Sequence, residues 1–117
     1  MEQEAKATRS PLLVVVALAA PMLVAAPAIA ADAAAAQALA QQNKCFSCHS
    51  VEKDKGGPAW KAVAAKYKGN KDAVAILTKH LETGPKVKMG SMEVEHPIIK
   101  ANSPADTKNL VEWLLSL

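Results

Sequence analysis

The stretch that decides the fold is Cys45-Phe46-Ser47-Cys48-His49, in which two cysteines stand three positions apart and a histidine follows the second. These are the only two cysteines of the 117-residue chain. Their spacing is too short for the disulfide framework that holds a small secreted fold together, so we expect the thiols to serve chemistry. A zinc site would need a second pair of ligands, and only His80 and His96 remain, badly spaced for a compact site.

The Cys-x-x-Cys-His pattern is the attachment signature of c-type haem. Two thiols on one helical turn can each add to a vinyl group of the same porphyrin, and the next residue brings an imidazole under the iron. The rival interpretation, a redox-active Cys-x-x-Cys, expects a βαβ setting that the pattern of this chain does not predict. We therefore predict one haem c, bound covalently by Cys45 and Cys48, with His49 as an axial ligand.

The N-terminal part is typical of a targeting segment. No charged residue stands between Pro11 and Ala31, Lys6 and Arg9 precede this apolar run, and Ala28-Ile29-Ala30 offers the small residues that a signal peptidase accepts. We predict that residues 1–30 are a cleaved secretory signal peptide, which leaves residues 31–117 as a periplasmic domain without a membrane span. Anchoring by an uncleaved signal is the alternative, because about 20 apolar residues can span a bilayer.

The amino-acid composition reduces the number of possible functions further. The chain carries 14 basic and 11 acidic residues, a net charge of +3, and no concentrated basic stripe, so we expect no nucleic-acid binding. It has only four aromatic residues, counting two Trp, one Tyr and one Phe. A domain of this size is marginal on its own side chains, and a buried porphyrin would supply the missing apolar centre.

Hydrophobic periodicity predicts an all-α domain of about four helices, over residues 32–44, 58–67, 71–83 and 103–117. Asp32 is a plausible N-cap of the first helix, Gly84-Pro85 closes the third, and Ser103-Pro104-Ala105-Asp106 begins the last. No stretch is predicted to be a strand. Residues 84–102 are expected to form a long loop, and such loops are usually functional.

Beyond the haem motif, the chain from about Leu39 to Leu117 resembles the small bacterial class I cytochromes c. The resemblance rests on Gly57-Pro58-Ala59-Trp60, on Val63-Ala64-Ala65-Lys66-Tyr67 and on Leu110-Val111-Glu112-Trp113-Leu114-Leu115. It implies the class I fold around one haem, with the first and last helices crossing beside the haem edge. It also implies that the Pro58 carbonyl accepts a hydrogen bond from the His49 ring and that Trp60 packs against the haem.

The sixth ligand of the iron is less clear from the resemblance. Relatives bring a methionine sulfur to the iron, but a gapless count along the loop puts Val94 in the ligand position, and a count back from the last helix lands near His96. We favour Met92 as the ligand, with His96 and Met89 as alternatives. His80 stands where relatives often have an arginine that pairs with a haem propionate, so we expect it near that carboxylate.

These features predict a monomeric electron carrier and not an enzyme. One haem iron would pass single electrons between transient redox protein partners. Ten lysines between residues 44 and 88 are expected to surround the haem edge and to attract partners with an acidic docking patch. The alternative function is a haem protein with an open or displaceable distal site, which would bind small gases or peroxide as a sensor or weak peroxidase.

Overall fold

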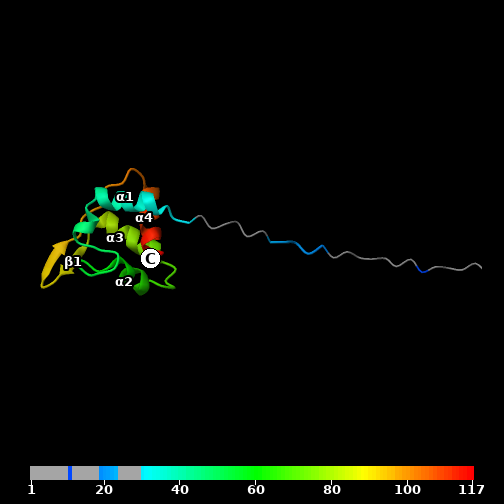
Figure 1. Cartoon of the computed structure of the whole chain (residues 1–117), viewed down its shortest axis with the longest axis horizontal. Coiled ribbons are helices and arrows are strands. Elements are labelled where there is room, and N and C mark those ends of the chain that lie inside the picture. Colours follow the sequence, from blue (N-terminus) through cyan, green and yellow to red (C-terminus); the bar gives the residue numbers. More distant parts are fainter. Residues whose placement is uncertain (1–10, 12–18, 24–29) are drawn as a thin grey trace, which may run out of the picture.

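The computed structural model describes residue 11, residues 19–23 and residues 30–117. Four α-helices and a small hairpin build the folded part (Figure 1). Its elements in chain order are α1 (Ala33–Gln42), a 3-10 turn η1 (Cys45–Ser47), α2 (Trp60–Lys66), α3 (Ala73–Thr83), β1 (Lys86–Met89), β2 (Met92–Glu95) and α4 (Pro104–Leu115). Most of the predicted signal peptide lies outside the described residues. Within the described part of the chain, no helix is long and apolar enough to cross a membrane.

Two polar caps begin the first and last helices and tie them together. The Asp32 carboxylate accepts a hydrogen bond from the Ala35 amide at the start of α1, and Ser103 and Asp106 form a reciprocal capping box at the start of α4. Asn109 on α4 both donates to the Asp32 carbonyl and accepts from the Asp32 amide, at 2.9 and 2.8 Å. The predicted starts of the first and last helices are confirmed, and α1 crosses α4 at this clamp.

The core is small and centres on two tryptophans. The Trp60 and Trp113 rings meet edge to face, with centroids 5.6 Å apart, and Leu39, Leu110 and two alanines of α1 pack around them. Among the described residues, Leu110 and Val111 are the largest side chains that are fully buried. So few large buried side chains leave much of the interior to be filled by something other than protein.

Helix α2 begins two residues later than predicted, at Trp60. The backbone amides of Trp60 and Lys61 donate to the carbonyls of Ser50 and Val51, and Ala59 donates to the Asp54 carboxylate. These bonds hold the segment before the helix in an extended conformation. Pro58 therefore precedes the helix, and its carbonyl is free to accept a hydrogen bond from a group outside the helix.

The prediction that no strand forms is wrong for residues 86–95. Strands β1 and β2 pair antiparallel, with Lys86 opposite Glu95, Val87 opposite Val94 and Lys88 opposite Glu93. The charged side chains are exposed, while Val87, Met89 and Val94 are half-buried. Apolar and charged residues thus alternate on both sides of a Gly-Ser turn, and this period of two marks a hairpin.

Candidate functional site

One apolar cavity of about 460 Å³ lies between the Cys-x-x-Cys-His turn, helices α2 to α4, the hairpin and the segment that follows it. Its wall includes Cys45, Cys48 and His49 from the turn, and Trp60 from α2. His80 and His96 line it from the other elements. The residues predicted to hold and contact a haem therefore share one hollow, with the exception of Met92.

The proximal wall is built by the five residues of the motif. Because η1 is a tight turn, the amides of Cys48 and His49 both donate to the Cys45 carbonyl, and both cysteines stay free thiols at the cavity wall. Burial raises the pKa of the Cys45 thiol. This wall brings two thiols and an imidazole to one side of the cavity, as attachment of a porphyrin requires.

The His49 ring is fixed by the carbonyl of Pro58, with 2.7 Å between Nδ1 and the oxygen. A carbonyl only accepts hydrogen bonds, so Nδ1 carries the proton and Nε2 keeps its lone pair for a metal. Such an outer hydrogen bond orients an axial histidine and raises its basicity. The geometry is the one that the resemblance implies.

Two neighbours hold the other faces of this ring. Gly57 passes so close that a Cβ there would lie 2.5 Å from the His49 Cε1 atom, and the Trp60 ring lies with its centroid 5.7 Å from that of His49. Trp60 also contacts Phe46, at 5.0 Å between centroids. The proximal imidazole is thus confined by backbone and by aromatic side chains.

The distal wall presents a second imidazole, that of His96. Its ring centroid lies 6.2 Å from the centroid of the His49 ring, and its Nδ1 lies 2.9 Å from the carbonyl oxygen of Pro97. The hydrogen bond again puts the proton on Nδ1 and leaves Nε2 as the free acceptor. The two rings therefore repeat the same arrangement on either side of the cavity.

The separation of the two rings fits one metal ion between them. Bonds from a metal to an imidazole nitrogen are about 2 Å long, and a ring centroid lies about 1 Å beyond its nitrogen, so two imidazoles on opposite sides of one ion have centroids roughly 6 Å apart. The observed 6.2 Å matches this value. Together with the two thiols on the proximal wall, the residues present fit a covalently bound haem with two histidines.

The backbone around His96 is anchored to the end of α3. The His96 amide donates to the Pro85 carbonyl at 2.9 Å, and the Ile99 amide donates to the Leu81 carbonyl at 2.8 Å. Gly84 ends α3 with a positive φ of 57°, and a Cβ at this position would lie 2.5 Å from the His96 carbonyl oxygen. This close contact between the two backbones fixes the position of His96 in the cavity wall.

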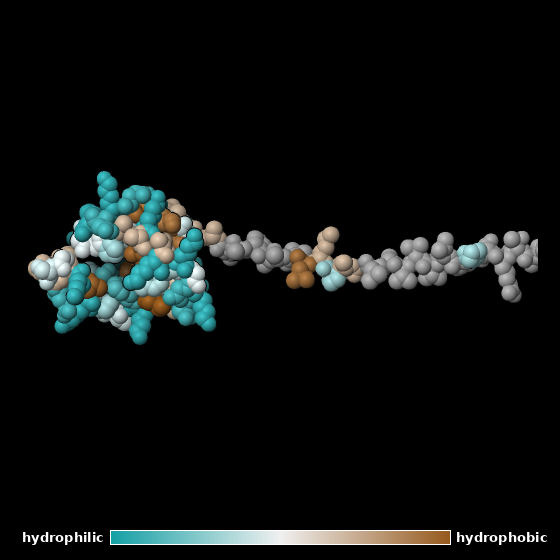
Figure 2. All heavy atoms as spheres, turned by 90° about the horizontal axis from the view of Figure 1, so that it is seen from below, coloured by the Kyte–Doolittle hydropathy of each residue, from teal (hydrophilic) through white to brown (hydrophobic). Residues whose placement is uncertain are grey.

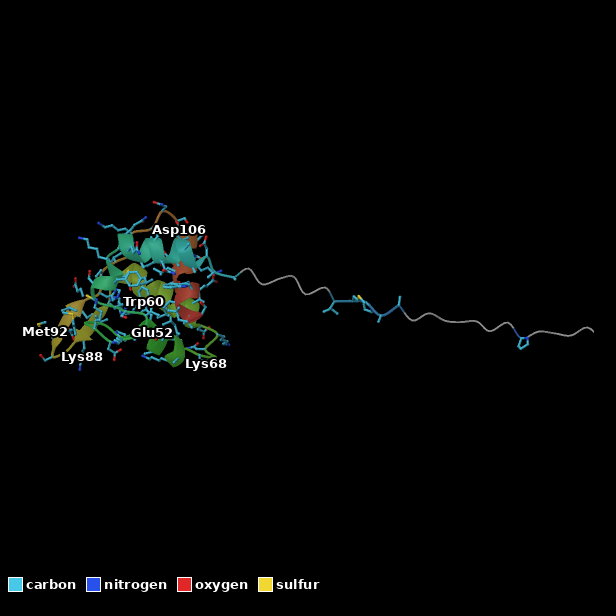
Figure 3. The ribbon with its side chains drawn as sticks, viewed as in Figure 1. Glu52, Trp60, Lys68, Lys88, Met92 and Asp106 are labelled. Carbon is cyan, nitrogen blue, oxygen red and sulfur yellow. The ribbon has the colours of Figure 1, made fainter. Side chains whose placement is uncertain are left out.

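Met92, which the sequence favours as sixth ligand, and the alternative Met89 lie in different places. Met92 is 57% exposed on the hairpin and is absent from the cavity wall; Figure 3 shows it at the outer end of the domain. Met89 does line the cavity, but its Sδ lies against Gly56, near the Cys48 side chain. Of the three candidates for the sixth ligand, His96 and Met89 line the cavity and Met92 does not, and the identity of that ligand stays a prediction.

A third imidazole, His80, packs against the distal one. The His80 and His96 rings meet edge to face, with centroids 4.6 Å apart. Burial lowers the pKa of both imidazoles, and the neighbouring His49 adds to the lowering for each. The Pro97 carbonyl raises the pKa of His96 and so opposes part of this shift. Both rings therefore favour the neutral form, which is the form that binds metals.

Sequence reasoning missed one residue that joins the two walls. Asn43, the C-cap of α1 just before the haem motif, donates from its side-chain amide to the carbonyl of Lys100 and accepts from the Lys100 amide, at 2.9 and 2.7 Å. Only its position at a helix end marks Asn43 in the sequence, and nothing there indicates a partner 57 residues away. This pair links the segment after His96 to the proximal turn.

Comparisons with known proteins identify the family of the chain. The family model described as Cytochrome c matches residues 33–117. Cytochrome c-551 of Pseudomonas denitrificans is 38% identical over 81 residues, covering 69% of this chain and 95% of the relative. Cytochrome c-552 of Hydrogenobacter thermophilus is 35% identical over 96 residues, covering 82% and 95%.

A solved structure points the same way. The crystal structure of the class 1 cytochrome MtoD from Sideroxydans lithotrophicus ES-1 superposes with a TM-score of 0.72 at 50% identity, covering 74% of this chain and 97% of that one. The predicted class I fold is confirmed, with the two-stranded hairpin added to its four helices. The chain belongs to the cytochrome c family, as a small class I member that binds one covalently attached haem c and serves electron transport.

Proposed function

We propose that the protein is an exported, monomeric electron carrier whose haem is bound through Cys45 and Cys48 and held axially by His49 and His96. The observation that carries the proposal is the pair of imidazoles that line one cavity with their ring centroids 6.2 Å apart. When bound, the haem supplies a one-electron couple between ferrous and ferric iron. The protein then accepts one electron from a redox partner and passes it to another, without a chemical transformation of its own.

The side chains of the site suit a carrier because hydrogen bonds to backbone carbonyls hold both imidazole rings in place. Each axial imidazole donates from Nδ1 to a carbonyl, that of Pro58 or Pro97, and so presents Nε2 to the metal in either oxidation state. Fixed ligands keep the structural change on electron transfer small. Two imidazoles also favour ferric iron more than an imidazole and a thioether do, and the reduction potential is expected to be correspondingly low for this family.

The alternative function, a sensor or weak peroxidase, requires an open or displaceable distal position. In the proposed site protein side chains fill both axial positions, and the His96 backbone is tied to α3 by the amide bond to Pro85. Carbon monoxide or peroxide would have to displace a ring held in place by this anchor. We therefore expect the reduced protein to bind carbon monoxide poorly, which separates the carrier from a gas-binding protein.

Location and processing belong to the same proposal. Cleavage after Ala30 would release residues 31–117 into the periplasm, where c-type haem is attached and where transient redox partners meet the carrier. Sequencing the N-terminus of the exported holoprotein tests this directly. An N-terminus at Ala31 supports the proposal, whereas a retained Met1 would indicate a membrane anchor.

The ligand pair is tested by optical and electron paramagnetic resonance spectra of the exported ferric holoprotein. We expect a low-spin ferric haem without the weak far-red charge-transfer band that a methionine sulfur produces, in the wild type and in Met92→Ala alike. His96→Ala should turn the spectrum high-spin and let carbon monoxide shift the Soret band of the reduced protein. Met92→Ala is the matched control, because it removes an exposed side chain from the same loop.

Each outcome of these spectra identifies the group at the distal position of the iron. A far-red band that disappears in Met92→Ala would restore Met92 as the ligand and overturn the pair proposed here. A wild type that is high-spin and binds carbon monoxide would instead support the gas-binding alternative. Cyclic voltammetry of the same sample tests the carrier itself, which must show one reversible one-electron wave.

A further inference from the structure

We propose that the surface of α2, on the side away from the hairpin, is the docking site for an acidic redox protein. This inference rests on the proposed function and adds the face through which the partner is met. The site is a groove of about 490 Å³ with a floor of small and apolar side chains from α2, α3 and the end of α4. Among its lining residues the charged side chains are Lys61 and Lys68, and none is acidic.

The groove lies in the most unbalanced stretch of charge in the mature domain. Residues 61–71 contain Lys61, Lys66, Lys68 and Lys71 and no acidic residue, and all four lysines are exposed. Lys61 pairs with Glu52. No salt bridge occupies the other three in the part of the chain that the structure describes. Lys68 lines the groove, Lys66 at the end of α2 lines the haem cavity, and Lys71 lies before α3; we call these three lysines the α2 basic face.

The hairpin at the other end of the domain carries as many acids as lysines. Lys86 stands opposite Glu95 and Lys88 opposite Glu93 in the strand register, and Lys86 also lies 3.5 Å from Glu93. The two strands are therefore neutral in sum. Figure 3 shows Lys88 on the hairpin and Lys68 beyond α2 at opposite ends of the domain, so the positive potential is not spread evenly around the cavity.

The view of the domain from below, the side on which α2 lies in Figure 1, agrees with this distribution. Long hydrophilic side chains project around this face, with hydrophobic atoms exposed between them (Figure 2). A rim of positive charge around a small apolar floor suits a brief encounter with an acidic protein, because charge steers the approach and a small contact allows rapid release.

The groove is also close to the haem cavity. Tyr67, the C-cap of α2, lines both hollows, and the Lys66 ammonium lies 5.7 Å from the centre of its ring. One aromatic side chain therefore belongs to the walls of both the cavity and the docking groove. A partner seated on the α2 basic face would lie beside this ring and so close to the cavity that would hold the haem.

Adsorption on a gold electrode that bears a carboxylate-terminated monolayer provides the test, with the holoprotein at low ionic strength. Lys66→Gln/Lys68→Gln/Lys71→Gln should lower the apparent adsorption constant about ten-fold, as three weak exposed ion pairs are lost. The matched control is Lys44→Gln/Lys86→Gln/Lys88→Gln, which removes the same charge from the hairpin and from the position before Cys45. We expect the control to retain adsorption within about two-fold of the wild type.

The two triple variants decide between faces. Equal losses would mean that net charge alone matters, and a larger loss in the control would place docking at the hairpin; either result overturns the proposal. Tighter binding of the wild type to phosphatidylglycerol vesicles than to the carboxylate surface would assign the face to lipid and also overturn it. A missing reversible wave for the wild type in solution, by contrast, would refute the carrier function and not the choice of face.

Discussion

The two walls of the haem cavity are specified in very different ways. The proximal wall comes from residues 45–60, in which two thiols, an imidazole, the carbonyl that orients it and an aromatic neighbour follow each other within one short stretch. The distal wall comes from residues 84–102, and its imidazole is placed by bonds to the end of another helix. Local chemistry fixes the first wall, and tertiary contacts fix the second.

The comparison shows which parts of a haem site can change while the fold persists. A thioether-forming turn tolerates almost no variation, because both thiols must reach the same porphyrin and the histidine must follow directly. On the distal side, a side chain can serve as ligand when the backbone places its donor atom within bonding distance of the iron. In the ligand pair proposed above, the anchor at Gly84 and Pro85 does so for His96, while the hairpin leaves Met92 exposed and places the Met89 Sδ against Gly56.

Removing the proximal attachment is expected to have the largest effect. Cys45→Ala/Cys48→Ala should abolish covalent haem and leave the domain largely unfolded, because few large side chains are buried without the porphyrin. Haem staining after denaturing electrophoresis and far-ultraviolet circular dichroism measure the two effects. Ser47→Ala changes the exposed residue between the cysteines and should keep both haem and helicity; a folded, cooperative haem-free double variant would contradict the expectation.

Changing the distal ligand should leave the fold intact and move the potential. His96→Met should raise the reduction potential by on the order of 0.1 V, since axial ligands set haem potentials over a span of roughly 0.8 V and a thioether favours ferrous iron. Protein-film voltammetry gives the shift, and the far-red band should appear with it. Met92→Leu serves as the control, and a potential that responds to Met92 but not to His96 would show that the distal wall has been misassigned.

The same contrast explains what the sequence could predict. The haem motif, the Pro58 carbonyl and Trp60 were predictable because their chemistry depends on spacing along the chain, and the structure brings all of them to one wall. The distal side was less predictable, because counting along a loop assumes that the loop has no internal pairing. The hairpin shortens the path between Lys86 and Glu95, and that places His96 and not Met92 over the cavity.

A closer reading of the alternation could have found the hairpin. Lys86-Val87-Lys88-Met89 and Met92-Glu93-Val94-Glu95 alternate charged and apolar residues around Gly90-Ser91, with opposite charges on facing strands. Strand formation places Val87 and Val94 against the cavity. The bonds from Asn43 to Lys100 had no such signal, because side-chain amides at a helix end can bond to many backbone groups.

On the distal side, Gly84→Ala tests the anchor that holds His96. The substitution forces an alanine into a positive φ and drives its Cβ to 2.5 Å from the His96 carbonyl oxygen. We expect a loss of about 2–4 kcal/mol in the free energy of unfolding of the holoprotein, measured in guanidinium chloride. Because the collision moves the distal segment, exogenous imidazole or cyanide should also displace His96 faster, and an unchanged displacement rate would argue against the anchor.

On the proximal side, Gly57→Ala tests a smaller constraint of the same kind. Its Cβ would lie 2.5 Å from the Cε1 atom of His49, but the backbone needs no positive φ there, so the ring and its neighbours must shift at a cost of about 1–3 kcal/mol. Gly56→Ala is the matched control, because its Cβ would be tight only against the flexible end of Met89, at 3.0 Å from Sδ, and in ordinary contact with the Cys48 Cβ at 3.7 Å, so it should cost less than about 1 kcal/mol. Guanidinium titrations of the two holoproteins give the difference. The displacement rate of the distal ligand should stay at the wild-type value in both variants; a faster rate in Gly57→Ala would mean that the two walls are coupled and that the proximal histidine helps to hold the distal one.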